Sequence, residues 1–388
     1  MKILFTVENY YPKMSGVPVV VKYLAEGMAT LGHNVTIVTK EVDGTPKREE
    51  IGGVQIVRMN IYYDGLKRFR GETKEYIDYV KNFDCDAIIF QCSQCITTDL
   101  LLKELHQIKA KTILHSHGFS GLTLQPFRRM STLKNTIGNT FNWIRWNVYY
   151  ATTFKKFVKE FDETVCLSEV DSSKSYLDKY SKNQVRILSN ASEDIFFQLD
   201  SFNNPISKYT QLINENYFIS VANYSGYKNQ KGILEQFYKA KVNNYDMVFI
   251  GGSENYYYKS LLHFNHKLSL QHGKRNVHFL TGVQREHIPS IMKNATFYLV
   301  GSTFEEFSIS LIESMALGVP FISTNVGNAR VLPGGITISD LREMHKIINS
   351  LLSNFNKRSD LSYKGREYAL KSCRINEAVK CLLNIIAM

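Results

Sequence analysis

Continuous runs of apolar residues recur along nearly the whole chain, and stretches with helical periodicity separate them. A strand that is apolar at every position is covered on both faces, which is typical of parallel sheets flanked by helices. The pattern therefore predicts an α/β fold built from doubly wound parallel sheets. The expected strands are 2–7, 34–39, 86–91, 111–117, 163–168, 185–190, 217–223, 246–252, 276–282, 295–302 and 320–325.

The chain of 388 residues is too long for one ordinary hydrophobic core, so we expect two domains. The segment 194–216 is polar, contains Pro205 and lacks a strand pattern, and it places the boundary near 200 to 214. We therefore predict domains at 1–200 and 201–360. Two doubly wound domains that face each other form a central cleft, and such sheets bind ligands at the carboxyl ends of their strands.

The segment 302–320 predicts a helix from about Ser308 to Leu317, which Gly318 and Pro320 end. Glu313 falls inside the apolar band of this helix. A buried carboxylate costs several kcal/mol unless a partner satisfies it. Glu313 therefore either pairs with an Arg or Lys of the fold or binds a ligand that donates hydrogen bonds.

The chain carries 47 Lys and Arg against 36 Asp and Glu, a net charge of +11. A positive field favours anionic partners such as sugar nucleotides, phosphate-linked lipids, membrane surfaces or nucleic acid. No apolar run reaches the roughly 18 residues that span a bilayer, and the apolar start of the chain is too short for a signal peptide. We therefore expect a cytoplasmic protein, or one peripheral on the inner face of the cell membrane.

Two short motifs resemble metal sites. Cys92 and Cys95 form a CxxC without the second pair that zinc would need, and we interpret the six cysteines as reduced and structural. Asp84 and Asp86 form a DxD, but they precede a strand instead of following it. The sequence therefore predicts no metal.

In the first half of the chain, two strand ends carry candidate binding groups. Gly16 opens a helix that runs to about Thr30, so backbone N–H groups can approach a phosphate or sugar closely there. His115 and His117 alternate at the end of a buried strand, so we expect them to point to opposite sides. His117 precedes Gly118 and is the candidate for a substrate contact, whereas His115 is expected in the core.

In the second half, charged groups follow two strands. Lys228 and Lys231 come after the strand 217–223 and are candidates for binding a diphosphate. Solvated lysines on a surface loop are the plain alternative. Glu305 and Glu306 precede the helix that carries Glu313. The carboxylates can accept hydrogen bonds from sugar hydroxyls, and we expect free backbone N–H groups to hold a pyrophosphate at the helix start, namely those of Phe307, Ser308 and Ile309.

The segment EEFSISLIESMALGVPFISTNVG resembles the family-4 glycosyltransferases, retaining enzymes of the GT-B fold, and the resemblance extends from residue 1 to about 370. Its strongest part is Glu305-x7-Glu313. The resemblance implies that Glu305 binds the donor sugar and Glu313 the ribose of the nucleotide. It also implies that Gly16 lies near the donor phosphates, that His117 is the active-site histidine and that Lys228 holds the diphosphate.

The same resemblance aligns Asn190 with the segment before the interdomain crossing, and implies that a last helix, about 361–386, crosses back onto the first domain. Two positions depart from the family pattern. Asn223 stands where the family often has an arginine beside the diphosphate, with Lys231 as a substitute, and Glu306 and Ser308 replace common glycines. These departures leave the donor sugar open.

We expect the acceptor and lipid contacts in the first domain. Trp143, Trp146, Tyr150, Phe154, Phe157 and Phe161 recur at helical spacing, with basic residues opposite. We interpret this helix as packing its aromatic stripe on the sheet and solvating its basic back, with a basic amphipathic membrane helix as the alternative. The preceding segment carries Arg128, Arg129 and Lys134 and is the stronger candidate for contact with lipid or acceptor.

Taken together, these features predict a retaining glycosyltransferase, independent of metal and of a cofactor. It would move a hexose or N-acetylhexosamine from a nucleoside-diphosphate sugar, with UDP as the commoner donor, to a cell-surface glycan or lipid-linked acceptor. Because no enzyme nucleophile is evident, the acceptor hydroxyl would attack on the face that the diphosphate leaves. The alternatives are a nucleotide-sugar 2-epimerase of the same fold and a non-enzymatic basic peripheral lipid-binding protein. No nucleic-acid recognition motif appears.

Overall fold

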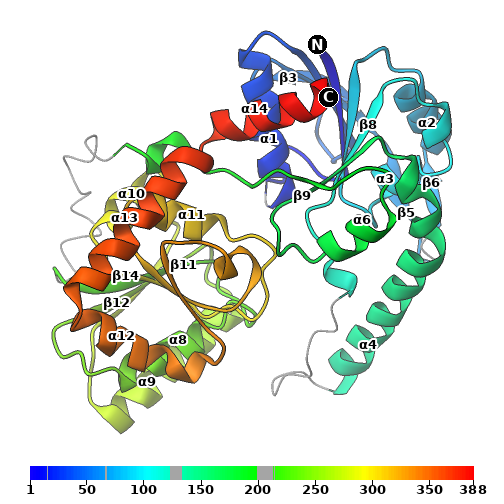
Figure 1. Cartoon of the computed structure of the whole chain (residues 1–388). Helices are drawn as coiled ribbons and strands as arrows, with labels where there is room; N and C mark the ends of the chain where they lie inside the picture. Colours follow the sequence, from blue (N-terminus) through cyan, green and yellow to red (C-terminus); the bar gives the residue numbers. More distant parts are fainter. Residues whose placement is uncertain (15, 66–67, 123–132, 199–212, 214) are drawn as a thin grey trace. The chain divides into compact units, whose positions relative to one another are not determined.

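The computed structural model describes residues 1–14, 16–65, 68–122, 133–198, 213 and 215–388 (Figure 1). The chain divides into two compact units. Unit 1 comprises Met1–Asn190 and Ile375–Met388, and unit 2 comprises Ala191–Arg374. Pro205, Arg128 and Arg129 lie outside the described residues, as does most of the segment 200–214.

Unit 1 is built on a sheet with the strand order β10-β9-β8-β7-β1-β2-β4-β3. All pairings are parallel except that of β3 with β4. The strands are β1 (Lys2–Val7), β2 (Asn34–Lys40), β3 (Arg48–Ile51), β4 (Val54–Met59), β7 (Ala87–Gln91), β8 (Lys111–His115), β9 (Glu163–Cys166) and β10 (Arg186–Ile187). The short strands β5 (Ile61–Tyr63) and β6 (Phe69–Gly71) form a separate antiparallel pair.

The helices of unit 1 include α1 (Val17–Thr30), α2 (Thr73–Lys81), α3 (Ile96–Asp99), α4 (Leu133–Val148), α5 (Lys155–Phe157), α6 (Lys174–Tyr180) and α14 (Ile375–Ala387). A π-helical segment, Tyr149–Phe154, joins α4 to α5. Helix α14 packs on α1 so closely that a Cβ at Gly27 would lie 2.7 Å from Cγ2 of Val379. This contact holds the C-terminal helix against α1.

Unit 2 is built on a fully parallel sheet with the order β13-β12-β11-β14-β15-β16. Its strands are β11 (Tyr217–Val221), β12 (Asp246–Gly251), β13 (Val277–Thr281), β14 (Phe297–Val300), β15 (Phe321–Thr324) and β16 (Gly335–Ile338). Its described residues include the helices α8 (Gln230–Lys239), α9 (Tyr256–His272), α10 (Ile288–Lys293), α11 (Ile309–Ala316), α12 (Met344–Leu352) and α13 (Phe355–Ser372).

The strands are apolar at successive positions because both faces of the sheet are buried, as the sequence predicted. In β11, Tyr217 and Ile219 belong to one buried cluster of unit 2, whereas Phe218 belongs to the cluster on the other face. Successive side chains of a strand point to opposite faces, so a strand buried on both sides needs an apolar residue at each position. All eleven predicted strands are present, each within a few residues of its predicted bounds.

The division between the units differs from the predicted domain limits of 200 and 361. Phe196 and Phe197 already belong to a core of unit 2, as do Ala369 and Cys373 of the last predicted helix. That helix is in fact two helices, because α13 ends at Ser372 and Arg374 forms a β-bridge with Ser192 before α14 begins. Only α14 therefore joins unit 1. Within the described residues, no helix is long and apolar enough to cross a membrane.

Candidate active site

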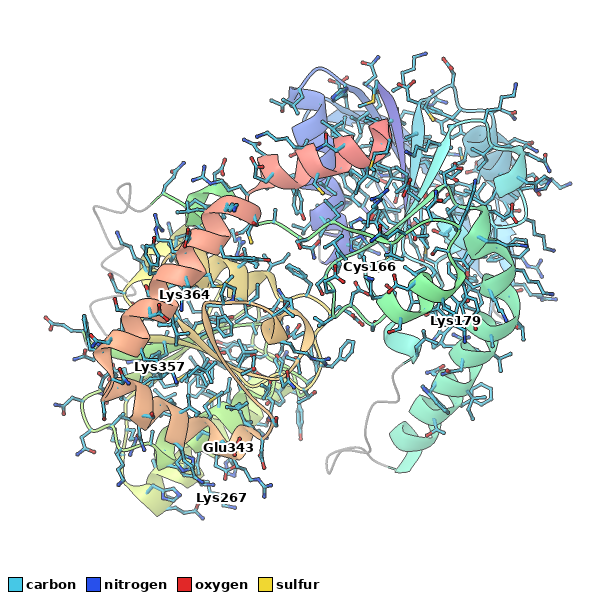
Figure 2. The ribbon with its side chains drawn as sticks, in the orientation of Figure 1. Cys166, Lys179, Lys267, Glu343, Lys357 and Lys364 are labelled. Atoms are coloured by element: carbon cyan, nitrogen blue, oxygen red, sulfur yellow. The ribbon has the colours of Figure 1, made fainter. Side chains whose placement is uncertain are left out.

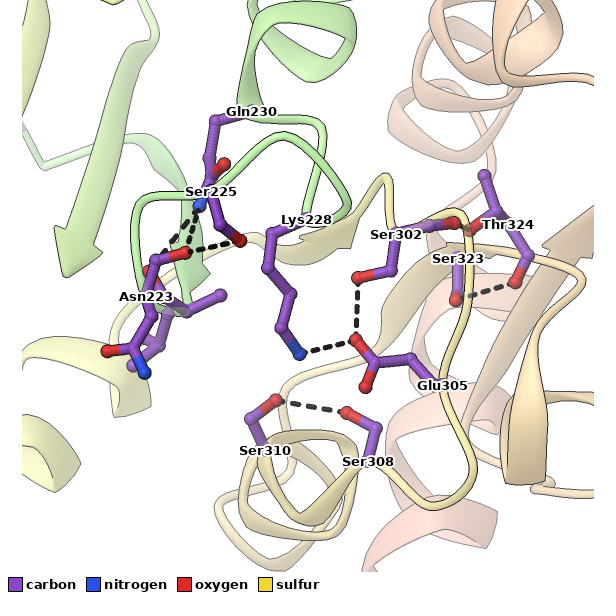
Figure 3. Close-up of polar contacts among 12 residues, drawn as sticks. Asn223, Ser225, Lys228, Gln230, Ser302, Glu305, Ser308, Ser310, Ser323 and Thr324 are labelled. Carbon is purple, nitrogen blue, oxygen red and sulfur yellow. Dashed lines mark hydrogen bonds and ion pairs between the residues drawn. The ribbon is translucent and has the colours of Figure 1, made fainter. Parts of the chain in front are cut away.

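At the carboxyl edge of the sheet in unit 2, a lysine and a glutamate from two different loops meet. Lys228 follows β11, Glu305 follows β14, and these two strands are neighbours. Nζ of Lys228 lies 2.5 Å from Oε1 of Glu305, and the hydroxyl of Ser302 donates to the same oxygen at 2.7 Å (Figure 3). Both charged side chains line a small pocket with the hydroxyl residues Ser308 and Ser310.

The loop that carries Glu305 is held in place by the strand that follows it. Thr324 donates to the backbone carbonyl of Ser302 at 2.5 Å. Gly327 has φ +49, and a Cβ there would lie 2.7 Å from the carbonyl oxygen of Glu305 and 2.8 Å from that of Glu306. Only a residue without a Cβ lets the two backbone segments approach so closely.

One of the expected phosphate-binding amides is already occupied. The backbone N–H of Ser308 donates to Oδ1 of Asn328 at 2.8 Å, so it is not free as the sequence suggested. The sequence could not indicate this partner, which follows the next strand. Ser308 does precede the first residue of α11, and its hydroxyl lies 3.1 Å from that of Ser310. The hydroxyl, which lines the pocket, is therefore the group of Ser308 that can meet a ligand. Phe307 and Ile309 flank it and are partly exposed.

The structure separates the two candidate lysines. Nζ of Lys231 lies 5.6 Å from the ring centroid of Tyr257 and 5.8 Å from that of Phe264, both on α9. It is not among the residues that line the pocket around Lys228. Asn223 is exposed at the end of β11, where its backbone carbonyl accepts a hydrogen bond from the Gln230 side chain at 3.0 Å. Lys228 is therefore the cation that the fold directs to Glu305.

Glu313 is buried in α11, as predicted, and its side chain is 3% exposed. Its partner is Arg285, whose guanidinium donates to Oε1 of Glu313 and also to Oε2 of Glu193, the latter at 2.8 Å. Arg285 also lies over the ring of Phe196, 4.5 Å from its centroid. Burial raises the pKa of Glu313, and the charge of Arg285 opposes that shift. Of the two alternatives for Glu313, the ion pair within the fold is the one present here.

In unit 1, the two histidines do not point to opposite sides. Their ring centroids lie 3.9 Å apart with an interplanar angle of 40°. The prediction of opposite directions was wrong because β8 ends at His115, and His117 has φ +54, so strand alternation no longer applies. Nε2 of His117 lies 2.6 Å from Oε1 of Gln91, at the end of the adjacent β7. Burial holds the pKa of His117 well below its usual value, so this imidazole is neutral.

Gly16, Asn190 and the DxD motif also lie in unit 1. Gly16 precedes α1 with φ +65, a conformation that favours glycine. Asn190 is the last residue of unit 1 in this part of the chain, and its Oδ1 is buried without a partner among the described residues. Asp86 accepts a hydrogen bond from the backbone N–H of Lys2 at 2.7 Å. The DxD thus supports the entry of β7, as the sequence indicated.

Burial raises the pKa of Cys92 well above its usual value and that of Cys95 to about 11. Both thiols are therefore protonated at neutral pH, which agrees with the structural role expected of them. In the described part of the chain, no three His, Cys, Asp or Glu side chains gather into a metal-binding group.

Three residues escaped the sequence analysis: Arg285, Gln91 and Asp99. Burial raises the pKa of Asp99 to about 6, and Tyr149 donates a 2.6 Å hydrogen bond to Oδ1 of Asp99. Gln91 ends β7 and Arg285 follows β13, and the sequence predicted both strands. The strand-end rule that selected Lys228 would have found these two, whereas Asp99 left no signal beyond its own charge.

Two family models together match most of the chain. Residues 14–191 match the model described as Glycosyltransferase Family 4, and residues 206–368 match the model described as Glycosyl transferases group 1. The chain belongs to the family 4 glycosyltransferases. The search of curated protein sequences returned no match to this glycosyltransferase.

Solved structures identify the fold of the glycosyltransferase as GT-B. Sucrose-phosphate synthase from Thermosynechococcus elongatus is 15% identical with a TM-score of 0.74, and the match covers 100% of this chain and 98% of that one. A glycosyltransferase from Rickettsia africae is 14% identical with a TM-score of 0.72, covering 99% and 97%. HepE from Anabaena, solved in complex with UDP-glucose, is 13% identical with a TM-score of 0.68, covering 100% of both chains.

Proposed function

We propose that this glycosyltransferase moves a hexose or N-acetylhexosamine from a UDP-sugar to a hydroxyl of a cell-surface glycan or lipid-linked acceptor, with retention at the anomeric carbon. The observation that carries the proposal is the contact between Lys228 and Glu305 at the carboxyl edge of the parallel sheet in unit 2. Ligands of doubly wound sheets bind at that edge. A cation and a carboxylate side by side suit a ligand that has both a phosphate and sugar hydroxyls.

In this proposal the ammonium of Lys228 neutralises the diphosphate. The group has three donors, so it can bond a phosphate oxygen and still keep Glu305 in place. The carboxylate of Glu305, held by Ser302, accepts hydrogen bonds from hydroxyls of the donor sugar. Because charge builds up on the leaving diphosphate, a fixed cation there lowers the barrier to its departure. No metal and no cofactor enters the proposed mechanism.

Glu313 is the proposed ribose ligand. Its Oε1 already accepts from Arg285, so a ribose diol would add to this ion pair or displace it. Arg285 has a second acceptor in Glu193 and is 43% exposed, so it can move at modest cost. A uridine donor is supported by analogy with HepE alone, whose structure contains UDP-glucose.

In unit 1, Gly16 and the neutral His117 remain our candidates for contacts with the donor phosphates and the reacting sugar. The described residues include six free cysteines, which fits a reducing compartment such as the cytoplasm, where nucleotide sugars serve as donors. We propose that the acceptor hydroxyl attacks on the face from which the diphosphate departs.

A thermal-shift titration with UDP, GDP and ADP tests the donor site. Ligands that bind the native state raise the melting temperature, and one nucleotide should do so for the unchanged protein. Lys228→Gln should abolish most of this shift, and Glu313→Ala should reduce it. Lys231→Gln is the matched control, because Lys231 lies against α9 and should keep the full shift. The absence of a shift with every nucleotide would overturn the proposal.

The fate of a UDP-sugar incubated with the protein separates transfer from epimerisation. Transfer predicts release of UDP that rises when a glycan acceptor is added. Formation of the C2 epimer without release of UDP would instead identify a 2-epimerase and contradict the proposed reaction.

A further inference from the structure

Helix α4 exposes an apolar stripe on the side opposite to its packed aromatic residues. Phe141, Ile144 and Val148 are 68%, 49% and 54% exposed. Residues three and four positions apart in a helix share one face, so these three form a single strip. The stripe predicted from the sequence does pack inward farther along, where Tyr150 and Phe154 are buried. The exposed strip is a second apolar face, which the sequence analysis did not consider.

The exposed strip continues into a basic concavity. Thr152 donates to the backbone carbonyl of Val148 at 2.6 Å, one turn beyond the strip. Thr152 then lines a shallow hollow whose other residues are Ala151, Lys155, Lys156, Lys159, Lys179 and Tyr180. Lys179 comes from α6 (labelled in Figure 2), and its Nζ lies 5.3 Å from the ring centroid of Tyr180. We call the strip and the hollow together the α4–α6 face.

The charge of this face is uncompensated over the described residues. None of its four lysines forms an ion pair there, although other lysines of unit 1 do. Of the acids close by in sequence, Asp178 is engaged by Lys174 at 2.7 Å, and Asp162 lies 3.8 Å from Nζ of Lys182. Glu160 is exposed beside Lys159. The four lysines of the face therefore outnumber the acids close to them in sequence.

We propose that the α4–α6 face docks on an anionic membrane surface. Apolar residues on one part of a helix and lysines beside them suit the boundary of a bilayer, where apolar side chains enter the acyl region and cations meet lipid phosphates. Nucleic acid would match the lysines but leave Phe141, Ile144 and Val148 in water. Large apolar patches on a soluble surface mark interaction sites. This inference does not depend on the donor site in unit 2.

Vesicle flotation tests the proposal directly. The full-length protein should float with phosphatidylcholine vesicles that contain about one third phosphatidylglycerol, and less with phosphatidylcholine alone. High salt should weaken this binding, because screening reduces the contribution of the lysines. Replacing Lys155, Lys156, Lys159 and Lys179 together by Gln should lower the partition coefficient at least about tenfold. Phe141→Ser with Val148→Ser should lower it by a similar factor.

Matched controls come from unit 2. Phe355 is exposed to the same 68% as Phe141, so Phe355→Ser removes an equal apolar group elsewhere. A second control removes the same charge from unit 2. It replaces four exposed lysines by Gln, namely Lys267, Lys346, Lys357 and Lys371 (Figure 2 labels Lys267 and Lys357). Both controls should float as the unchanged protein does. Equal loss in control and test variants would overturn the proposal, as would flotation that survives both test variants or an unchanged protein that does not float.

Donor binding provides the check on folding and separates the two proposals. Both test variants should keep the nucleotide-induced rise in melting temperature, because their substitutions lie in unit 1 and far from Lys228 in the sequence. Loss of flotation with an intact nucleotide shift supports the membrane surface. An unchanged protein that floats but binds no nucleotide would overturn the proposed function and leave the membrane inference standing.

Discussion

The guanidinium of Arg285 donates a hydrogen bond to the buried carboxylate of Glu313, across 28 positions of the chain. A carboxylate inside an apolar helix thus has a partner within its own unit before any ligand binds. The same arginine reaches Glu193 and lies over Phe196. The segment Glu193–Phe196, the loop after β13 and helix α11 are therefore connected through one side chain.

Removing Arg285 should destabilise unit 2 more than neutralising Glu313. Arg285→Ala leaves a buried charge without its partner, which costs on the order of 2–4 kcal/mol, whereas Glu313→Gln leaves Arg285 paired with Glu193. Thermal unfolding of the two variants at neutral pH measures the difference. A larger loss of stability in Glu313→Gln than in Arg285→Ala would contradict the prediction that Glu313 depends on Arg285 more than Arg285 depends on Glu313.

The cost of Arg285→Ala should depend on pH. Burial raises the pKa of Glu313 above its usual 4.5, and losing the arginine raises it further. A carboxyl whose pKa is higher in the folded state contributes its stability in full below the unfolded pKa, and this contribution is lost as the pH rises through the folded pKa. The deficit of the variant should therefore be small near pH 4.5 and grow toward about pH 8. A deficit that stays constant with pH would contradict this account.

Gly327 should not tolerate a side chain. Gly327→Ala places a Cβ within 2.7 Å of the Glu305 carbonyl oxygen, in a residue with φ +49. We expect a loss of about 1–3 kcal/mol in stability and a higher KM for the donor, because the loop that carries Glu305 must move. Gly273→Ala is the control, since Gly273 also has a positive φ of +87 but no atom within 4 Å of its Cβ position. Equal effects of the two variants would show that backbone strain alone is responsible.

Gln91 should act as a positioning residue for His117. Its Oε1 accepts from Nε2 of His117 at 2.6 Å, which leaves Nδ1 as the acceptor of the neutral ring. Gln91→Leu removes this restraint, and we expect kcat to fall about tenfold or more with little change in KM. Gln91→Glu should instead favour the charged imidazole and raise the pKa of His117. A new inflection in the pH–rate profile of Gln91→Glu, absent from the unchanged protein, is the measurement that checks this role.

Asp99 should make unit 1 more stable in mild acid than at neutral pH. Burial raises its pKa from 3.8 to about 6, so its contribution to stability is complete below 3.8 and is lost as the pH rises through 6. Asp99→Asn removes this dependence and can still accept from Tyr149. From about pH 5 to about pH 8 the variant should gain on the order of 1 kcal/mol relative to the unchanged protein. The exposed Asp360→Asn is the control, and an identical pH response of both variants would refute the prediction.

Several elements of the structure could not be predicted from the sequence. Strands β3, β4, β5, β6 and β16 were missed. In β3 (Arg48–Ile51) and β16 (Gly335–Ile338) most residues are at most partly buried and no continuous apolar run is present. Strand β4 is buried, but Gln55 and Arg58 interrupt its apolar run. The break between α13 and α14 was missed because the helical pattern continues through Cys373. What ends α13 is a β-bridge of Arg374 with Ser192, a contact between segments far apart in the chain.

The sequence by itself determined most of the segments that form buried strands and the residues at their carboxyl ends, because burial on both faces imposes a local and continuous apolar pattern. It thereby selected Lys228, Glu305 and His117. Only the tertiary structure decided which of these groups meet. Lys228 reaches Glu305 over 77 positions because β11 and β14 are neighbours in the sheet. Strand order, the partner of Glu313 and the occupied amide of Ser308 all depend on long-range packing, which no local periodicity records.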